Sequence, residues 1–461
     1  MQKRLKWLDG VMKYCVAAII LAVPLYPKFP FIRIPGTFVS IRLEDLLIAF
    51  GVFLLLIEVI PNINLFLKDK LNQSVILFLT IGLASLCSAV FVTKTVLPHI
   101  GFLHWARRVE YFIPLFLGLI SIRKNRSNAG FYFKTILIVV FITFVYGLGQ
   151  RYLDWPIIIT QNEEYSKGVA LRWITGSHIN STFAGHYDLA TFLVLVLPIV
   201  ASSTFLLKNK KTKVILAIVF LFGLWLLVVS ASRISLVSYF VAVSGTLVLI
   251  KKAKAIPIIL TVSILFTGFS PNLVDRYKRV IDVSVNKLNN SSLLNYDFFP
   301  NVVLATTDDE TLFEREEIVL TPTPPPVIED RSTNIRFNVE WPRAFRALAK
   351  NPLLGTGYSS ITLATDNDYL RLLGEVGLLG FFAFILIFVR LGQKLFSVYP
   401  FKKYSGIELA FLSGFVGSIP GLLLNAVFID IFEASKFAII FWLLTGICLG
   451  LVKYEKNEGK N

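Results

Sequence analysis

The feature that most constrains this chain is a series of long apolar runs spread over almost its whole length. Each run has about the length that a helix needs to cross the hydrocarbon core of a bilayer, roughly 20 residues. The sequence contains twelve such runs. They lie at approximately 12–27, 43–60, 74–93, 109–122, 131–149, 187–206, 214–230, 233–250, 255–270, 377–392, 406–427 and 433–452. The expected fold is an all-α polytopic membrane protein with about 12 transmembrane helices.

The composition supports this interpretation. Of the 461 residues, 55% are hydrophobic and 16% are charged, and the mean hydropathy is +0.67. A soluble domain has about 45–50% apolar and about 25% charged residues, so a soluble enzyme and a disordered protein are excluded. Cys15, Cys87 and Cys448 all lie in apolar runs and are interpreted as buried hydrophobes rather than as a disulfide framework or a metal pair.

Basic residues are unevenly shared between the two sides of the predicted spans. An even number of spans puts both termini on one side, together with the connections at 61–73, 123–134, 207–213, 251–254 and 390–405. With the termini (1–13 and 453–461), these segments hold 24 Lys/Arg and four acids, a net charge of +20, against 22 basic and 26 acidic residues elsewhere, a net charge of −4. By the positive-inside rule this side is cytoplasmic. The formal net charge of +16 therefore records topology, and no nucleic-acid partner is expected.

Two long connections lie on the opposite side, at about 150–186 and about 271–376. Long loops in a compact protein are usually functional or disordered. In the second loop, about 303–330 is acidic and proline-rich and is predicted to be an extended insertion, whereas about 331–376 is rich in aromatics, arginines and turns and is predicted to fold. The expected organisation is 1–270 with nine helices and the outer loop, 271–376 as the large extracytoplasmic loop, and 377–461 with three helices and a cytoplasmic tail.

Four polar clusters on the extracytoplasmic side are candidates for chemistry. They lie at 172–176 with 181–186, at 230–233, at 336–343 with 351–358, and at 366–371 with 374–377. They place several arginines and a few carboxylates at the outer membrane boundary. Arginine binds phosphate oxygens with a planar fork and stays charged, and a carboxylate can accept the proton of a sugar hydroxyl. Since no ATP is available outside, a transferase there needs an already activated donor, and a glycan on a polyprenyl pyrophosphate meets that need.

The order of these motifs resembles the O-antigen ligase/polymerase family of Wzy- and WaaL-like proteins. The motifs are Arg172 with Thr175-Gly176, S-T-F-x-G at 181–185, Ser232-Arg233, Arg336 with Trp341, N-P-L-L-G-x-G-Y at 351–358, D-N-D-Y-L at 366–370 and E-x-G-L-L-G at 375–380. The resemblance covers most of the chain, and the order and topology together are more specific than any one motif. It implies a glycosyltransferase that takes glycans from undecaprenyl pyrophosphate on the periplasmic face, without metal or nucleotide.

The resemblance also suggests roles for individual residues. Arg233 matches the arginine of the family's S-R turn, and Arg336 resembles the loop arginine before the tryptophan. Asp366 stands where the ligases have the histidine of an H-N-x-Y-L stretch, which weakens the histidine-dependent ligase assignment and favours polymerase-like members. Arg233, Arg336 and Asp366 are therefore the predicted catalytic residues. The predicted substrate-binding residues are Arg107, Arg172, His186, Arg343, Asn367, Tyr369, Arg371 and Glu375.

Structural explanations remain open for most of these residues. Arg233 is also compatible with an interfacial arginine that reaches the headgroups, and Arg336 with a solvated loop charge. Asp366 is also suited to cap the helix that enters the tenth span. For Arg107, with Glu110 nearby, a structural ion pair is favoured over substrate contact. The histidines lack metal-ligand spacing, so neither a metal nor another cofactor is expected.

The favoured hypothesis is an enzyme of the bacterial inner membrane with both termini cytoplasmic. It would transfer or polymerise glycan from a polyprenyl-pyrophosphate donor to a glycan or lipid-linked glycan acceptor, in contact with membrane lipids. One alternative is a ligase that attaches the glycan to a lipid, protein or cell-wall acceptor. Another is a flippase for lipid-linked glycans, which predicts ionisable residues deep within the helices rather than charges gathered at one face.

Overall fold

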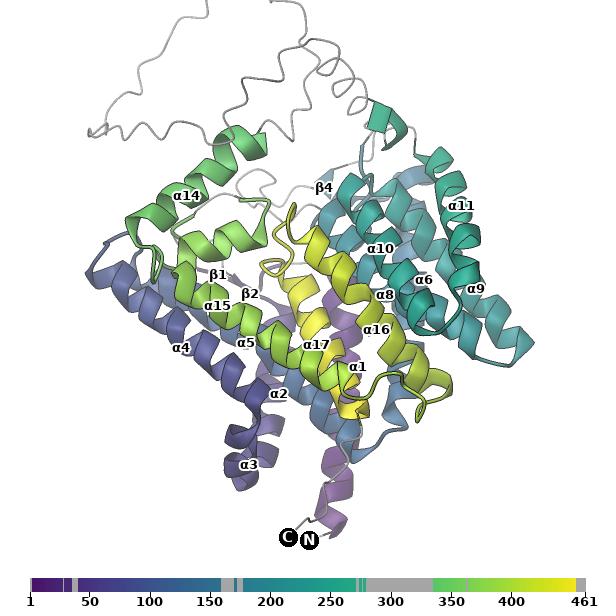
Figure 1. Cartoon of the computed structure of the whole chain (residues 1–461), viewed down its shortest axis with the longest axis horizontal. Helices are drawn as coiled ribbons and strands as arrows, with labels where there is room; N and C mark the ends of the chain where they lie inside the picture. The colour runs from purple at the N-terminus through teal and green to yellow at the C-terminus, as the bar shows by residue number, and fades with distance from the viewer. Residues whose placement is uncertain are drawn as a thin grey trace, which may run out of the picture.

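The computed structural model describes residues 2–27, 29–34, 40–158, 170–171, 177–270, 273–275, 277–278, 335–361 and 364–452. In this part of the chain the protein is a bundle of long helices, and its strands form two short antiparallel ladders (Figure 1). The predicted substrate-binding residue Arg172 and the predicted acidic insertion at about 303–330 lie outside the described residues.

Each of the twelve predicted spans overlaps one α-helix. These helices are α1 (Gln2–Leu25), α2 (Leu43–Val59), α4 (Lys70–Phe91), α5 (Pro98–Lys124), α6 (Asn128–Tyr152), α8 (His186–Leu206), α9 (Lys210–Val229), α10 (Arg233–Leu249), α11 (Ile256–Phe266), α15 (Asp368–Phe396), α16 (Gly406–Asn425) and α17 (Ser435–Leu451). The smaller elements are β1 (Ile32–Arg33), β2 (Ser40–Ile41), η1 (Ile60–Asn62), α3 (Ile63–Lys68), β3 (Ile157–Ile158), β4 (Ala170–Leu171), η2 (Ala253–Ala255), η3 (Thr267–Phe269), η4 (Arg336–Glu340) and α14 (Trp341–Lys350). Some helices begin at a polar cap: the side chains of Asp69 and Asn209 accept backbone N–H groups at the starts of α4 and α9.

Eight helices among the described residues are long and apolar enough to cross a membrane. They are α1, α2 continued by α3, α4, α6, α8, α9, α15 and α16. Three further apolar helices, α10, α11 and α17, are shorter, and α5 carries Arg107, Arg108 and Glu110 in its middle turns. The chain is therefore a multi-pass membrane protein, as predicted, whereas the count of twelve crossings and the domain boundaries remain predictions.

The centre of the bundle is formed by α8, α16 and α17. Almost every residue of α17 is buried, and it packs along α5, while α16 packs between α8 and α10 (Figure 1). Gly446 shows how closely the backbones approach, because a Cβ at this position would collide with the carbonyl oxygen of Leu115 on α5. Close backbone approach at small residues is a main source of helix association in lipid, where there is no hydrophobic driving force between helices.

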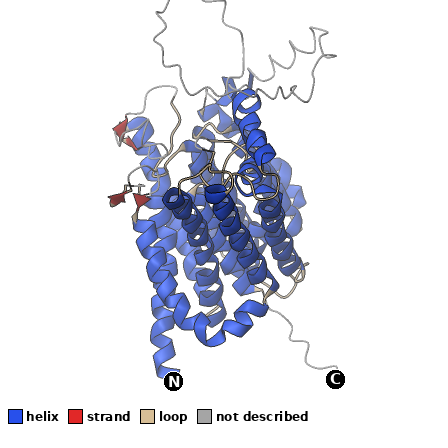
Figure 2. Ribbon diagram, turned by 90° about the vertical axis from the view of Figure 1, so that its left-hand side faces the viewer, coloured by secondary structure: helices blue, strands red, loops and turns tan. Residues whose placement is uncertain are grey.

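Lys436, the second residue of α17, shows which helix ends lie together. Its buried ammonium donates to the carbonyl oxygens of Pro24, near the end of α1, at 3.2 Å, and of Thr182, just before α8, at 2.8 Å. The end of α1 and the starts of α8 and α17 therefore share one end of the bundle, which we call the site end. The N-terminus lies at the opposite end (Figure 2), and α17 runs away from the site end toward it, as an even number of crossings requires.

Candidate active site

Arg336 and Asp366, two of the three predicted catalytic residues, form an ion pair at the site end. The Nε and Nη2 atoms of Arg336 both donate to Oδ2 of Asp366, at 3.1 and 2.8 Å. The two residues are 30 positions apart in the sequence, and the arginine is only 9% exposed. A solvated loop charge is therefore the wrong description of Arg336, because its guanidinium is buried against a carboxylate.

The local backbone explains how Arg336 is held. Arg336–Glu340 forms the π-helix η4, in which the N–H of Trp341 bonds back to the carbonyl of Arg336. This turn leads directly into α14, where Pro342 occupies a first-turn position at which its missing N–H is tolerated. The Trp341 ring anchors the segment, with centroids 4.5 Å from Phe337 and 6.4 Å from Phe428. Single π-turns of this kind are frequent at functional sites.

Asp366 is presented by a strained loop that Asp430 clamps on both sides. Its φ of 49° lies in the left-handed region, which costs energy for any residue with a side chain. The Asp430 carboxylate accepts the backbone N–H of Thr365 at 2.9 Å through Oδ2 and that of Asn367 at 2.8 Å through Oδ1. These two hydrogen bonds flank Asp366 and hold its backbone in the strained conformation.

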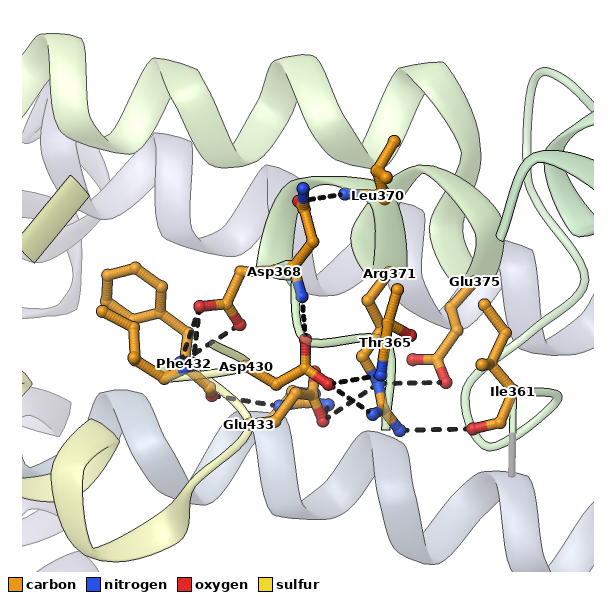
Figure 3. Close-up of polar contacts among 12 residues, drawn as sticks. Ile361, Thr365, Asp368, Leu370, Arg371, Glu375, Asp430, Phe432 and Glu433 are labelled. Carbon is orange, nitrogen blue, oxygen red and sulfur yellow. Dashed lines mark hydrogen bonds and ion pairs between the residues drawn. The ribbon is translucent and has the colours of Figure 1, made fainter. Parts of the chain in front are cut away.

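A buried ion network fixes Asp430 in turn (Figure 3). Arg371 donates through Nη1 to Oδ2 of Asp430 at 3.1 Å, and its Nε lies 3.6 Å from Oε1 of Glu375 and 3.7 Å from Oε2 of Glu433. Glu433 also pairs with Arg108 of α5. The network links α5, the first turns of α15 and the loop between α16 and α17, and its charges come from elements far apart in the sequence.

The start of α15 is fixed by two neighbouring side chains. Asn367, not Asp366, caps this helix, because its Oδ1 accepts the N–H of Leu370 at 3.0 Å. The Asp368 carboxylate accepts the backbone N–H groups of Ile431 at 2.7 Å and Phe432 at 3.2 Å (Figure 3). The cap interpretation of Asp366 is thus wrong, and the side chain of Asp366 is directed to Arg336 instead.

The N-P-L-L-G-x-G-Y motif closes a break in α15. At Gly377 the backbone leaves the helix, with φ 70° and ψ −173°, a conformation that is essentially restricted to glycine. Residues of the motif satisfy the backbone groups that the break exposes: the N–H groups of Thr356 and Gly357 bond to the carbonyls of Gly374 and Glu375, at 2.9 and 2.8 Å. The motif therefore sets the direction of the short helical segment that carries Asp368, Arg371 and Glu375.

Arg233 lies on the other side of the end of α16. It is the first residue of α10, and its carbonyl accepts the hydroxyl of Tyr277 at 2.9 Å. Two residues further on, Ser235 donates to Oδ1 of Asn425, the last residue of α16, at 3.2 Å. The next residue, Ala426, accepts the N–H of Asp368 at 2.9 Å. The Arg233 turn and the Asp366 loop are therefore anchored to consecutive residues at one helix end.

The other predicted binding residues lie at several places around the site. His186 starts α8, and its neighbour Tyr187 lies beside the Arg336 guanidinium, so this helix end also borders the ion pair. Arg107 pairs with Asp45 and Glu110 within the protein, as the structural interpretation predicts. Asn367, Tyr369, Arg371 and Glu375 lie in or near the buried network. The hydroxyl of Tyr369 donates to the Leu423 carbonyl at 2.9 Å. Arg343 lies on the first turn of α14.

Glu340 and Asp430 also belong to the site, although neither is among the residues predicted from the sequence. Burial raises the pKa of Glu340 to about 7, and the nearby carboxylate of Asp366 adds to the shift. Burial also raises the pKa of Asp366 although Arg336 opposes it. The sequence pointed to Glu340 only through its position between Arg336 and the Trp341-Pro342 pair. No local pattern points to Asp430, because the residues that it binds are more than 60 positions away.

Together, the fold and the site define a multi-pass membrane protein with an arginine–carboxylate centre at one end of its helices. Residues 216–385 match the family described as O-antigen ligase, and the matched segment contains Arg233, Arg336 and Asp366. The predicted resemblance to the O-antigen ligase/polymerase family is therefore confirmed over this segment. No curated protein matches the chain.

Proposed function

We propose that this protein is an integral-membrane glycosyltransferase that takes a glycan from a polyprenyl-pyrophosphate donor and transfers or polymerises it. The reaction would take place on the extracytoplasmic face of a bacterial inner membrane, with both termini in the cytoplasm. The observation that carries the proposal is the Arg336–Asp366 pair at the site end, with Arg233 anchored on the opposite side of the end of α16. The match to the O-antigen ligase family supports it.

The proposed mechanism assigns the two arginines to the pyrophosphate. Arg233 and Arg336 neutralise the charge that builds up on the leaving group as the anomeric carbon is attacked, which is the largest single contribution in many enzymes. Asp366 pairs with Arg336 in the free protein and would keep the guanidinium oriented as it binds the pyrophosphate. A carboxylate at the same site, Asp366 in the prediction from sequence, takes the proton of the attacking hydroxyl. One direct displacement inverts the anomeric centre.

Two alternatives differ in acceptor or in class. The family description favours a ligase, whereas the aspartate in place of the ligase histidine favours a polymerase; the two differ only in the acceptor. A flippase needs charges along a path through the bundle. The buried charged side chains among the described residues are instead Glu44, Arg108, Asp188, Arg336, Asp368, Glu375 and Lys436. Apart from Arg108 in the middle turns of α5, these side chains lie in the first turns of their elements, which favours an enzyme.

The test is a transfer assay with the purified protein in lipid and EDTA present. The substrates are lipid-linked glycans extracted from membranes of the organism that carries the protein, and the variants are Arg233→Ala, Arg336→Ala and Asp366→Ala. Arg126→Ala is a matched control, since Arg126 pairs with Glu408 at a distant surface. A ladder of longer lipid-linked glycans that is lost in the folded site variants supports a polymerase, and carrier release only with an added acceptor supports a ligase. Substrate movement across vesicles without turnover would support the flippase and contradict the proposal.

A further inference from the structure

Glu340 carries a buried carboxylate oxygen that nothing in the described part of the protein satisfies. Its Oε2 atom is shielded from solvent and has no hydrogen-bond partner. Buried polar atoms without a partner are rare in folded proteins, and they call for a specific explanation such as a catalytic role. Glu340 is the last residue of the π-turn that Arg336 begins, and with about 4.4 residues per turn, positions four apart lie on one face of a π-helix. The free oxygen therefore belongs to the same face as the Arg336–Asp366 pair.

Asp366, by contrast, is already engaged. Its Oδ2 accepts two hydrogen bonds from Arg336. Burial raises the pKa of Asp366, but taking a proton there would leave the charge of Arg336 uncompensated in a buried place, which opposes its use as a base. Asp366 is thus better suited to orient Arg336 than to act as a base, and Glu340 has the open acceptor atom.

We propose that Glu340 accepts the proton of the attacking hydroxyl and that Asp366 positions Arg336, an inference that rests on the proposed glycosyl transfer. The acceptor hydroxyl oxygen forms a bond to the anomeric carbon of the donor glycan while the bond from that carbon to the pyrophosphate oxygen breaks. The bonding pair leaves with the polyprenyl pyrophosphate, and the hydroxyl proton passes to the Glu340 carboxylate. The neutral glutamic acid then returns the proton to solvent, which restores the site.

The surroundings of Glu340 fit this role. The charged groups that face it are Arg336 on η4, Arg343 on α14, Asp366 on the loop before α15 and Asp430 on the loop before α17. Burial and the two acids raise its pKa to about 7, against the opposing effect of the two arginines. A general base works best when its pKa is close to the operating pH.

Two donors next to Glu340 extend the inference to the acceptor sugar. The Nε1 atom of Trp341 and the Nη1 atom of Arg343 are also buried and have no hydrogen-bond partner among the described residues. Glu340 and these neighbours therefore offer one acceptor and two donors on the first turn of α14. Sugar hydroxyls donate and accept at once, so this turn has the polar groups of a subsite for the acceptor glycan.

The experiment measures kcat against pH for the unaltered protein and for Glu340→Gln, Glu340→Asp and Asp366→Asn in lipid, with the extracted lipid-linked glycans as substrates. Binding of undecaprenyl pyrophosphate is measured in parallel. Glu408→Gln is the matched control, since it makes the same chemical change at a glutamate that pairs with Arg126 away from the site.

We expect kcat of the unaltered protein to rise with pH through about 7, as Glu340 loses its proton. Glu340→Gln should lower kcat about 100-fold or more and abolish this rise, while binding of undecaprenyl pyrophosphate stays within about threefold, because the glutamate is not its ligand. Glu340→Asp should keep the rise. Asp366→Asn should keep it but move it to lower pH, because a negative charge that raises the pKa of Glu340 is gone.

Other outcomes would overturn the inference in distinct ways. A Glu340→Gln variant that keeps the rise near pH 7 and most of its kcat would exclude Glu340 as the base and leave the proposed function intact. Loss of undecaprenyl pyrophosphate binding in the same variant would make Glu340 a structural or donor-binding residue. Absence of transfer by the unaltered protein with every acceptor would overturn the proposed function and this inference together.

Discussion

Replacing Asp430 with alanine tests whether this residue holds the loop that carries Asp366. The change removes the acceptors of two backbone N–H groups, Thr365 and Asn367, and one of the three carboxylates around Arg371. An unsatisfied buried donor costs about 1–3 kcal/mol, and the strained backbone of Asp366 adds about 1–3 kcal/mol that the clamp no longer offsets. The clamped form of the loop therefore loses roughly 3 kcal/mol or more relative to relaxed ones.

Since 1.4 kcal/mol corresponds to a factor of ten, this penalty reduces the fraction of molecules with a correctly placed Asp366 by about 100-fold. The assay compares kcat in the transfer reaction with the melting temperature of the same preparation. Asp430→Asn keeps one acceptor oxygen and should give an intermediate loss.

Asp69→Ala is the matched control for this prediction. Asp69 also accepts two backbone N–H groups, those of Leu71 and Asn72, and also pairs with a cation, Lys394, but it does so at the start of α4, away from the site. Asp69→Ala should lower the melting temperature about as much as Asp430→Ala does, while kcat of the folded protein stays unchanged. Equal kcat values in the Asp430→Ala and Asp69→Ala proteins would refute the clamp.

Three further predictions follow from the same geometry. Gly377→Ala should destabilise the protein by about 3 kcal/mol or more, because alanine rarely adopts its backbone angles and the new Cβ would collide with the backbone of Leu353; an unchanged melting temperature in lipid would contradict this. Arg336→Lys should lose most of the activity, since an ammonium cannot replace the two guanidinium nitrogens that bind Asp366. Activity within about threefold of the unaltered protein would contradict this role of the guanidinium. Deletion of about 303–329, a segment outside the described residues, should leave activity intact if it is a linker; loss of activity in a well-inserted protein would show that it contributes.

The sequence predicts the helices because each needs only a local signal. Twenty apolar residues in a row specify a membrane helix whatever their partners are, and each such run overlaps a helix of the structure. Arg336 and Asp366 could also be predicted from the sequence, because they lie in motifs whose order resembles that of the O-antigen ligase/polymerase family. Their contact could not be predicted, because no local pattern in either segment indicates an ion pair between residues 30 positions apart.

The residues that support the site were hidden for a different reason. Asp430 lies in a short segment between two apolar runs, where its sequence context predicts an ordinary loop carboxylate. Its importance comes from the two N–H groups that it accepts from the loop of Asp366 and from the guanidinium of Arg371. Such a role exists only once α15 and the loop after α16 have been brought together, so it follows from tertiary packing and not from local pattern.

Three arginines near the site are paired with carboxylates, and these pairs bear on how the donor would bind. Arg336 is neutralised by Asp366, Arg108 by Glu433, and Arg371 by Asp430 and its neighbours. Of these, the Arg108 and Arg371 pairs belong to the shared network that holds the loop, so an anion that displaced their partners would dismantle the support of the site. The Arg336–Asp366 pair lies outside that network. Counting side-chain atoms alone, the carboxylate is the more exposed partner, at 25% against 11% for the guanidinium side chain. We therefore expect the pyrophosphate of the proposed donor to bind at Arg336 beside Asp366, because binding there would leave the supporting network intact.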